Sequence, residues 1–318
     1  MTKVTIVGAG AVGAAIAYAA QIRGVCQELA LYDLNAEKVN AEVLDLNHGM
    51  QFTPMARIIG GDDLEVARDS DVIVITAGAK QKPGQTRLDL AAANVAMCRT
   101  LVPELVKLAP DTLLLLVTNP VDVVTLAAQQ YSGLPPNRVF GSGTVLDSSR
   151  LRYLIAERTG VAVQNVHAYI AGEHGDSEVP LWSSATIGGV SLPTWDAQFP
   201  DRPAVLDESG RDQIKDRVVS AAYEIIAGKG ATSLAIGLAV SRILEAVLNN
   251  ERRVLPVSSL LTRPSELAGV CLSMPTTVSR AGVGDVLLPP MDDAELAAVR
   301  SSADLVRAAC HELGLSTD

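Results

Sequence analysis

The first half of the chain alternates strand-length apolar runs with segments of helical spacing. The runs are apolar at consecutive positions, so both faces of each expected strand are buried. They are, in chain order, KVTIVGAG, ELALYDL, SDVIVITAG, DTLLLLVTNP and NRVFGSGT. Intervening segments such as AVGAAIAYAAQIRG and AEKVNAEVLDLNHG follow a helical period and end at glycine. Strands buried on both faces and separated by helices indicate an α/β fold with a doubly wound parallel sheet.

The pattern changes after about residue 145. Helices are expected over LDSSRLRYLIAERTG, GRDQIKDRVVSAAYEIIAGKG, TSLAIGLAVSRILEAVLNN and the closing segment DDAELAAVRSSADLVRAACHEL. The runs RVLPVSSL and GVCLSMPTTVSRAGVGDVLLP are typical of antiparallel strands. We therefore expect two domains: residues 1–143 form the parallel-sheet domain, and residues 144–318 form an α+β domain.

Composition narrows the class of protein without indicating a chemistry. Of the 318 residues, 48% are hydrophobic and 19% are charged, which favours a globular chain. The formal net charge of −10 argues against nucleic-acid binding. No apolar run approaches the ~20 residues of a membrane span, and a signal-peptide pattern is absent, so we expect a cytoplasmic protein without membrane contact. Four widely spaced cysteines indicate reduced thiols and no metal site.

The sequence GAGAVG at residues 8–13 matches the G-x-G-x-x-G pattern between an expected strand and an expected helix. Gly8 allows a tight turn, Gly10 lets the backbone approach a pyrophosphate, and Gly13 permits close contact of helix and strand. Asp33 ends the second strand, where a carboxylate binds ribose hydroxyls and repels a 2′-phosphate. The pattern predicts a Rossmann-type site for NAD rather than NADP. The alternative is a structural glycine turn with Asp33 as a surface cap.

Candidate chemistry appears at the start of the second half, in LDSSRLR and in AGEHGDSEVP. Asp147 and Arg150 are three residues apart and share one helix face, whereas Arg152 points elsewhere. His174 lies between acids and glycines and is either a proton donor or a structural ring. Residues 78–90 form a polar loop that contains Arg87 and is either a mobile lid or a solvated surface loop.

Together these residues resemble the L-lactate/malate dehydrogenase superfamily, and most of all its bacterial-type L-lactate dehydrogenases. The motifs that support the resemblance occur in the family's order from residue 4 to about residue 314: GAGAVG, Asp33, KQKPGQTR, VTNPVD, LDSSRLR, VHAYIAGEHGDSEVP and KGATSLAIG. Seven linked motifs are far more specific than the glycine pattern alone.

The resemblance implies a role for each matching residue. His174 is expected to be the acid/base, Asp147 its partner, and Arg150 the group that binds the substrate carboxylate. Arg87 would polarise the substrate carbonyl when the lid closes, and Asn119 would contact substrate and cofactor. The expected cofactor contacts are completed by Val12, Lys38, Thr76, Ala77, Gly78, Ala79, Val117, Thr118, Ser142 and Ile236.

The choice between pyruvate and oxaloacetate depends on Gln81. Malate-specific relatives have arginine at the matching position, which pairs with the second carboxylate of oxaloacetate. Neutral Gln81 leaves that carboxylate unpaired, at a cost of ~3 kcal/mol or more, so pyruvate is favoured. Thr232 would border the same pocket. The alternatives are a malate dehydrogenase, a broader 2-hydroxy-acid dehydrogenase, and a non-enzymatic NAD-binding protein.

Two further residues match an effector site in similar bacterial enzymes. Arg152 and His167 correspond to a pair that binds fructose 1,6-bisphosphate at a subunit interface, and the resemblance therefore implies activation by this ligand. The alternative is a surface arginine and a strand histidine with local partners. The same resemblance implies a homotetramer, possible in two steps through dimers.

Overall fold

The computed structural model describes residues 1–79 and 86–317. The expected substrate residue Gln81 lies outside these ranges, and so does the side chain of Arg87, whose backbone begins α3. The α-helices are α1 (Ala11–Arg23), α2 (Ala36–His48), α3 (Arg87–Leu108), α4 (Val121–Ser132), α5 (Val145–Thr159), α6 (Glu208–Lys229), α7 (Leu234–Leu248) and α8 (Asp293–Glu312).

A nine-stranded sheet in the described part of the chain has the order β14-β13-β12-β6-β5-β4-β1-β2-β3. Its strands are β1 (Lys3–Val7), β2 (Glu28–Tyr32), β3 (Arg57–Gly61), β4 (Val72–Ile75), β5 (Leu113–Leu116), β6 (Val139–Gly141), β12 (Arg253–Leu260), β13 (Cys271–Ser279) and β14 (Gly282–Val286). Strands β1 to β6 are parallel and follow the order 3-2-1-4-5-6 of a doubly wound dinucleotide-binding sheet. The predicted α/β class is confirmed.

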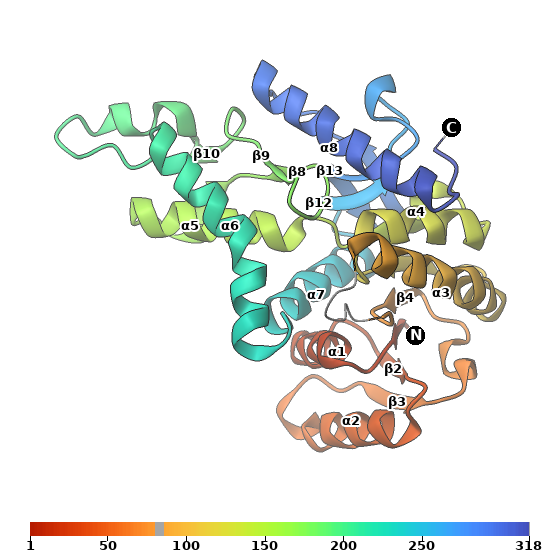
Figure 1. The fold of residues 1–318 in the computed structure, drawn as a ribbon. Coiled ribbons are helices and arrows are strands. Elements are labelled where there is room, and N and C mark those ends of the chain that lie inside the picture. The colour runs from red at the N-terminus through yellow and green to blue at the C-terminus, as the bar shows by residue number, and fades with distance from the viewer. Residues whose placement is uncertain (80–85, 318) are drawn as a thin grey trace.

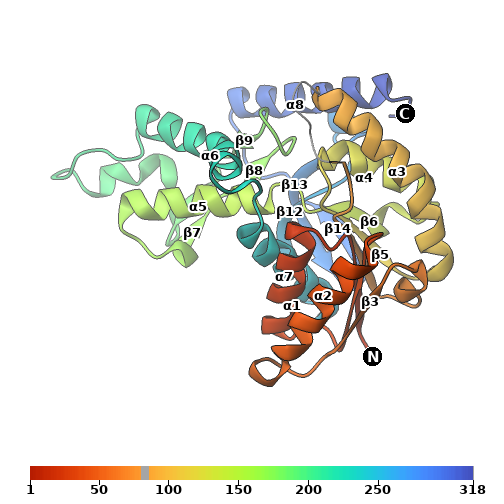
Figure 2. The same ribbon diagram turned by 60° about the horizontal axis from the view of Figure 1, so that its bottom comes forward.

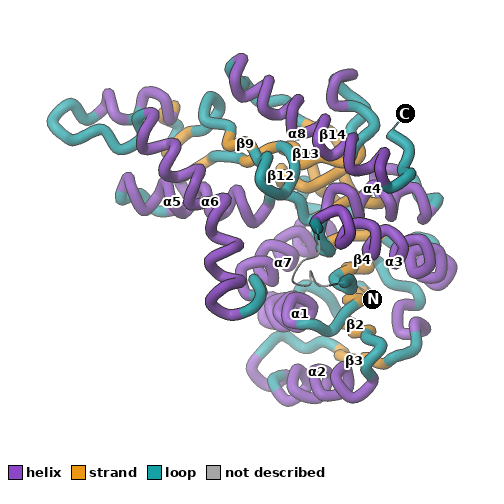
Figure 3. Tube along the Cα trace, in the orientation of Figure 1, coloured by secondary structure: helices purple, strands orange, loops and turns teal. Residues whose placement is uncertain are grey.

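The apolar character of both strand faces has a direct structural cause. Ile73 and Ile75 of β4 belong to one buried cluster, with apolar residues of α3, α4 and α8, whereas Val72 and Val74 belong to another, with residues of α1, α2 and α7. Alternate residues of a strand point to opposite faces, so each central strand contributes to two cores. Helices therefore cover the sheet on both sides (Figures 1 and 3).

The sheet and its core continue from the first half of the chain into the second. Ser258 of β12 pairs with Gly141 of β6, and β13 and β14 extend the sheet further. Helix α7 lies beside α1, where a Cβ on Gly237 would come within 2.7 Å of the Ala15 carbonyl oxygen (Figure 2). The antiparallel strands are where the sequence predicted them, but their attachment to the first sheet was not predicted.

A smaller part of the molecule projects from this sheet, on the left in Figure 1. It comprises α5, α6 and the short strands β7 (Val166–His167), β8 (Ile170–Ala171), β9 (Val179–Pro180), β10 (Thr186–Ile187) and β11 (Val190–Ser191). A third apolar cluster joins α5 to α6 and includes Ile155 and Ile214. None of the helices in the described ranges combines the length and apolarity that crossing a bilayer requires.

Candidate active site

The glycine turn between β1 and α1 is built by close backbone contacts. Gly8 has φ +105°, and a Cβ there would be 2.7 Å from the Ala77 nitrogen. A Cβ on Gly13 would be 1.9 Å from the Gly8 oxygen. At Gly10, by contrast, the nearest atom to an added Cβ is the Lys38 Nζ at 3.9 Å. Two glycines are thus required by the protein itself, and the open space at Gly10 fits a pyrophosphate at the helix N-terminus.

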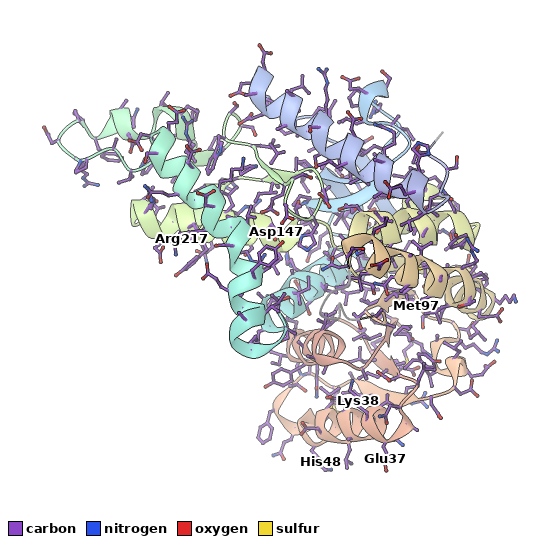
Figure 4. The ribbon with its side chains drawn as sticks, viewed as in Figure 1. Glu37, Lys38, His48, Met97, Asp147 and Arg217 are labelled. Atoms are coloured by element: carbon purple, nitrogen blue, oxygen red, sulfur yellow. The ribbon has the colours of Figure 1, made fainter. Side chains whose placement is uncertain are left out.

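Asp33 is held over this turn by backbone hydrogen bonds. Its Oδ2 accepts from the Ala9 N–H at 2.8 Å, and its Oδ1 accepts from the Asn35 N–H at 3.1 Å. The carboxylate is partly exposed, and the Nζ of Lys38 lies 3.8 Å from Oδ2. Figure 4 shows Lys38 on α2. The carboxylate is therefore oriented beside the space at Gly10, as a ribose contact requires.

The residues at the carboxyl ends of β4 and β5 are joined by side-chain hydrogen bonds. The Thr76 hydroxyl donates to the Gly8 oxygen at 2.8 Å, and the Thr118 hydroxyl donates to the Ala77 oxygen at 2.6 Å. Asn94 of α3, which sequence reasoning missed, accepts from the Ala79 N–H and donates to the Asn119 oxygen. An asparagine inside an apolar helix gives no sequence signal for this position.

The other expected cofactor residues are distributed around the same edge of the sheet. Val12, Val117 and Ile236 are partly buried and pack against the cluster that contains α1 and α7. Ser142 is buried directly after β6, and Gly78 follows β4, where a Cβ would be 2.5 Å from Thr118 Cγ2. The residues present therefore fit a dinucleotide along the carboxyl edge of β1, β2, β4 and β5.

The second half of the site centres on His174, which lies between β8 and β9. Its Nδ1 is 2.6 Å from Asp147 Oδ2, and the Arg150 Nη1 donates to Asp147 Oδ1 at 2.7 Å. Asp147 is 1% exposed, and both it and Arg150 belong to α5, where three-residue spacing places them on one face as predicted. Figure 4 shows Asp147 beside α6. One buried carboxylate thus joins the imidazole to the guanidinium.

Burial and charge act in opposite directions on this pair. Burial disfavours the charged ring of His174, but the Asp147 carboxylate stabilises it by charge and hydrogen bonding, and the net effect raises the pKa of His174 to about 9. Burial likewise disfavours the Asp147 carboxylate, yet the imidazole and the Arg150 guanidinium lower its pKa. His174 is therefore protonated near neutral pH, as a proton donor must be.

His174 and Arg150 border one cavity of about 230 Å³. Asn119, Asp147 and Tyr223 also line it. Thr232 lines an adjoining pocket that shares Arg150. The structure thus brings together Asn119, Asp147 and Arg150, three of the six residues expected to bind substrate, and places Thr232 next to them through Arg150.

Two buried acids beside His174 were missed at the sequence level. Asp122, 1% exposed, accepts the His174 backbone N–H at 2.8 Å and the Ser258 hydroxyl at 2.6 Å. Burial raises the pKa of Asp122 to about 6, although both hydrogen bonds and the charge of His174 oppose the rise. Its position in VTNPVD gives no indication that it contacts a loop 52 residues away.

Glu178 is the second missed acid and is 5% exposed at the same cavity. His174, Asp147 and Glu178 each have a possible ligand atom within 4.8 Å of the others. Both oxygens of Asp147 are already engaged by Arg150 and His174. This arrangement favours proton chemistry over metal ligation.

The two expected effector residues lie on neighbouring segments of the projecting part. The Arg152 Nε donates to the Ala168 oxygen at 2.8 Å, and its guanidinium lies 4.9 Å from the Tyr169 ring centroid. Burial lowers the pKa of Arg152, and Tyr169 opposes the shift. His167 is exposed on β7, opposite Thr186 of β10. Arg152 therefore has local partners, and His167 is open to solvent.

Comparison with known families matches both halves of the chain. Residues 2–141 match the lactate/malate dehydrogenase, NAD binding domain, and residues 144–313 match the lactate/malate dehydrogenase, alpha/beta C-terminal domain. The two matches together cover nearly the whole chain.

Individual relatives agree with the domain matches. The chain is 53% identical to the L-lactate dehydrogenase of Bifidobacterium animalis subsp. lactis (strain AD011), over 98% of this chain and 97% of that protein. It is 46% identical to the L-lactate dehydrogenase of Acetivibrio thermocellus, over 96% and 95%. A crystal structure of a lactate dehydrogenase from a Medee basin deep-sea metagenome library superimposes with a TM-score of 0.92 at 36% identity, over 98% and 99%. The chain therefore belongs to the lactate/malate dehydrogenase family and is an NAD-dependent oxidoreductase.

Proposed function

We propose that the chain catalyses reversible hydride transfer between NADH and pyruvate, giving L-lactate and NAD⁺. The observation that supports this most is the group of Asp147, Arg150 and His174 at one cavity, in which a buried carboxylate joins the guanidinium to an imidazole whose pKa is raised to about 9. Reduction of a 2-oxo acid needs a cation for the carboxylate and a proton for the carbonyl oxygen. The names of the relatives point to the same reaction.

Each residue of the group has a defined part in this proposal. Arg150 binds the substrate carboxylate, and its rigid guanidinium fixes the direction of the carbonyl. His174 gives its proton to the carbonyl oxygen during reduction and accepts it during oxidation. Asp147 keeps the ring oriented and stabilises the imidazolium. When bound, the nicotinamide supplies or accepts the hydride. Arg87, with its side chain outside the described part, would polarise the carbonyl.

Substrate choice is tested at Gln81, which lies outside the described residues. The wild type should reduce pyruvate faster than oxaloacetate, measured as loss of NADH absorbance. Gln81→Arg should raise the ratio of oxaloacetate to pyruvate activity, since a guanidinium pairs with the second carboxylate. Preference of the wild type for oxaloacetate would instead support malate dehydrogenase, and equal use of long-chain 2-oxo acids would support a broader specificity.

We also propose that fructose 1,6-bisphosphate activates the enzyme through Arg152 and His167. Supporting this, the two residues lie close together in the chain fold, because Arg152 binds the carbonyl next to His167, and His167 faces solvent. A cation and an imidazole there suit an anionic ligand. The test is a pyruvate saturation curve near neutral pH with and without the bisphosphate; superimposable curves would exclude activation.

We propose a homotetramer, or a dimer that tetramerises when the effector binds, as the assembly. Large apolar side chains are exposed on α1 and α7, including Tyr18, Ile22, Leu234 and Leu238. Such faces favour association of copies of the chain. The native mass, measured with and without the bisphosphate, tests the assembly; a monomer under both conditions would contradict it.

We also propose that the boundary between the two domains lies at residue 143.

A further inference from the structure

Glu178 is a buried acid without an assigned part in the reaction. It precedes β9, four residues after His174, and 5% of its surface is exposed. It lines the cavity that Arg150 and His174 also line. Among residues 1–79, 86 and 88–317, no group donates a hydrogen bond to its carboxyl. Asp147, equally buried, has a partner at each oxygen.

The surroundings of Glu178 decide its charge. Its carboxyl lies within 4.8 Å of Asp147 and His174, so one neighbour repels a negative charge and the other attracts it. Two more charged groups act on it, Arg150 from α5 and Asp176 from its own loop. An acid that is buried without a donor and lies next to a carboxylate is more stable when protonated.

Two further polar groups of the described part of the chain lie near this loop. The Tyr223 hydroxyl of α6 donates to Asp176 at 2.8 Å, and Asp122 of α4 binds the His174 backbone on the other side of the loop. Neither gives Glu178 a hydrogen bond. The polar groups around Glu178 thus come from α4, α5 and α6, and the three named here leave its carboxyl without a hydrogen bond.

We propose that Glu178 is a specificity-determining residue that remains a neutral acid in the resting enzyme, so that the cavity accepts a substrate carboxylate, and that loss of its proton weakens the binding of anionic substrates. The inference rests on the proposed function. In its neutral form Glu178 adds no negative charge to a cavity that Asp147 and Asp176 also line, so Arg150 and His174 remain available to the substrate carboxylate. Ionised Glu178 adds a negative charge within 4.8 Å of His174, which weakens the attraction of Arg150 and His174 for the substrate carboxylate.

The electrostatics of the site agree with this geometry. Burial and the Asp147 charge raise the pKa of Glu178 to about 8, while His174 and Arg150 oppose the rise. The Glu178 charge in turn contributes to the raised pKa of His174, after the larger influence of Asp147 and Asp122. Two coupled ionisations should thus control anion binding above neutral pH.

The experiment measures the affinity of the NADH complex for oxamate, an unreactive monoanionic analogue of pyruvate, from about pH 6 to about pH 10. Loss of two protons should make log Kd rise with a limiting slope of about two in the wild type, that is, about 100-fold per pH unit. In Glu178→Gln only His174 titrates, so the slope should be about one. The His174 ring should also lose its proton at lower pH, which a histidine NMR titration detects.

Two further variants separate charge from structure. Glu178→Asp retains a carboxyl and should restore the slope of about two. Glu104→Gln removes an exposed carboxylate from α3 and should leave the profile of the wild type unchanged. If Glu178→Gln does not fold, the Glu178→Asp and wild-type profiles still test the inference.

The outcomes distinguish the inference from the function on which it rests. A wild-type slope of about one, or identical slopes and His174 titrations in the wild type and Glu178→Gln, would overturn the part of Glu178 in an active enzyme. An equal loss of affinity at every pH would also overturn it, because that is the sign of a merely structural residue. Absence of oxamate binding and of pyruvate reduction at all pH values would refute the proposed function itself.

Discussion

The glycine turn and the group around His174 form the two ends of one site, and they are built in opposite ways. At the turn, a Cβ on Gly8 or Gly13 would collide with backbone atoms, so this end of the site requires residues that have no side chain. Around His174, the site depends on side chains whose charges compensate one another under burial. Added atoms should therefore damage the first end, and lost atoms or protons should damage the second.

The largest effect is expected from the charged end. His174→Asn removes the proton donor but keeps a polar side chain, and it should lower kcat/KM for pyruvate about 10²- to 10⁴-fold. Steady-state kinetics measures this loss. NADH binding, followed by fluorescence, should change little, because the glycine turn is untouched. A loss below about tenfold with an intact fold would mean that the two ends are not specialised in this way.

A smaller effect is expected from a matched pair at the glycine end. In Gly13→Ala the new Cβ meets the Gly8 oxygen at 1.9 Å, so the free energy of unfolding should fall by about 1–3 kcal/mol. Gly10→Ala meets nothing within 3.9 Å and should unfold like the wild type, yet bind NADH more weakly because the methyl group occupies the space for the pyrophosphate. Thermal unfolding and NADH titration of both variants measure the contrast. Equal stability of the two variants would contradict the claim that close backbone contacts require glycine at position 13.

The smallest effect is a dependence of stability on pH that only the charged end should show. The pKa of His174 is raised from 6.5 to about 9 in the folded protein, so its stabilising contribution is complete below pH 6.5 and is lost as the pH rises through 9. Glu178, with a pKa raised to about 8, changes stability in the same direction. The thermal midpoint should therefore fall as the pH rises from about 6.5 to about 9, and less so in His174→Asn. A rising midpoint would contradict the assigned protonation states.

Local signals in the sequence were sufficient for much of this structure. The continuous apolar runs predicted the parallel strands, because both faces of β4 and β5 are buried. Helical spacing alone placed Asp147 and Arg150 together and directed Arg152 to a different neighbour, the Ala168 carbonyl. These relations span only a few residues, and the geometry of a helix or a strand determines them.

Relations between distant segments were not predictable in this way. The contact of Asp122 with the His174 backbone and the pairing of β12 with β6 depend on how the chain returns to the first sheet. The same holds for Glu178, whose protonation follows from the neighbours that burial provides and not from its place in AGEHGDSEVP. Sequence pattern indicates which face a residue occupies, but not which residue lies opposite.

The shared sheet has a consequence for the synthesis of the protein. Residues of α7, β12 and β13 complete an apolar cluster whose other members precede residue 141. Until the ribosome has added those later segments, the apolar residues of α1 that contact α7 and the edge of β6 that pairs with β12 are not covered. The nascent N-terminal half thus exposes an apolar surface for several seconds at a typical rate of about 5–20 residues per second. Its burial waits until nearly nine-tenths of the polypeptide has been made.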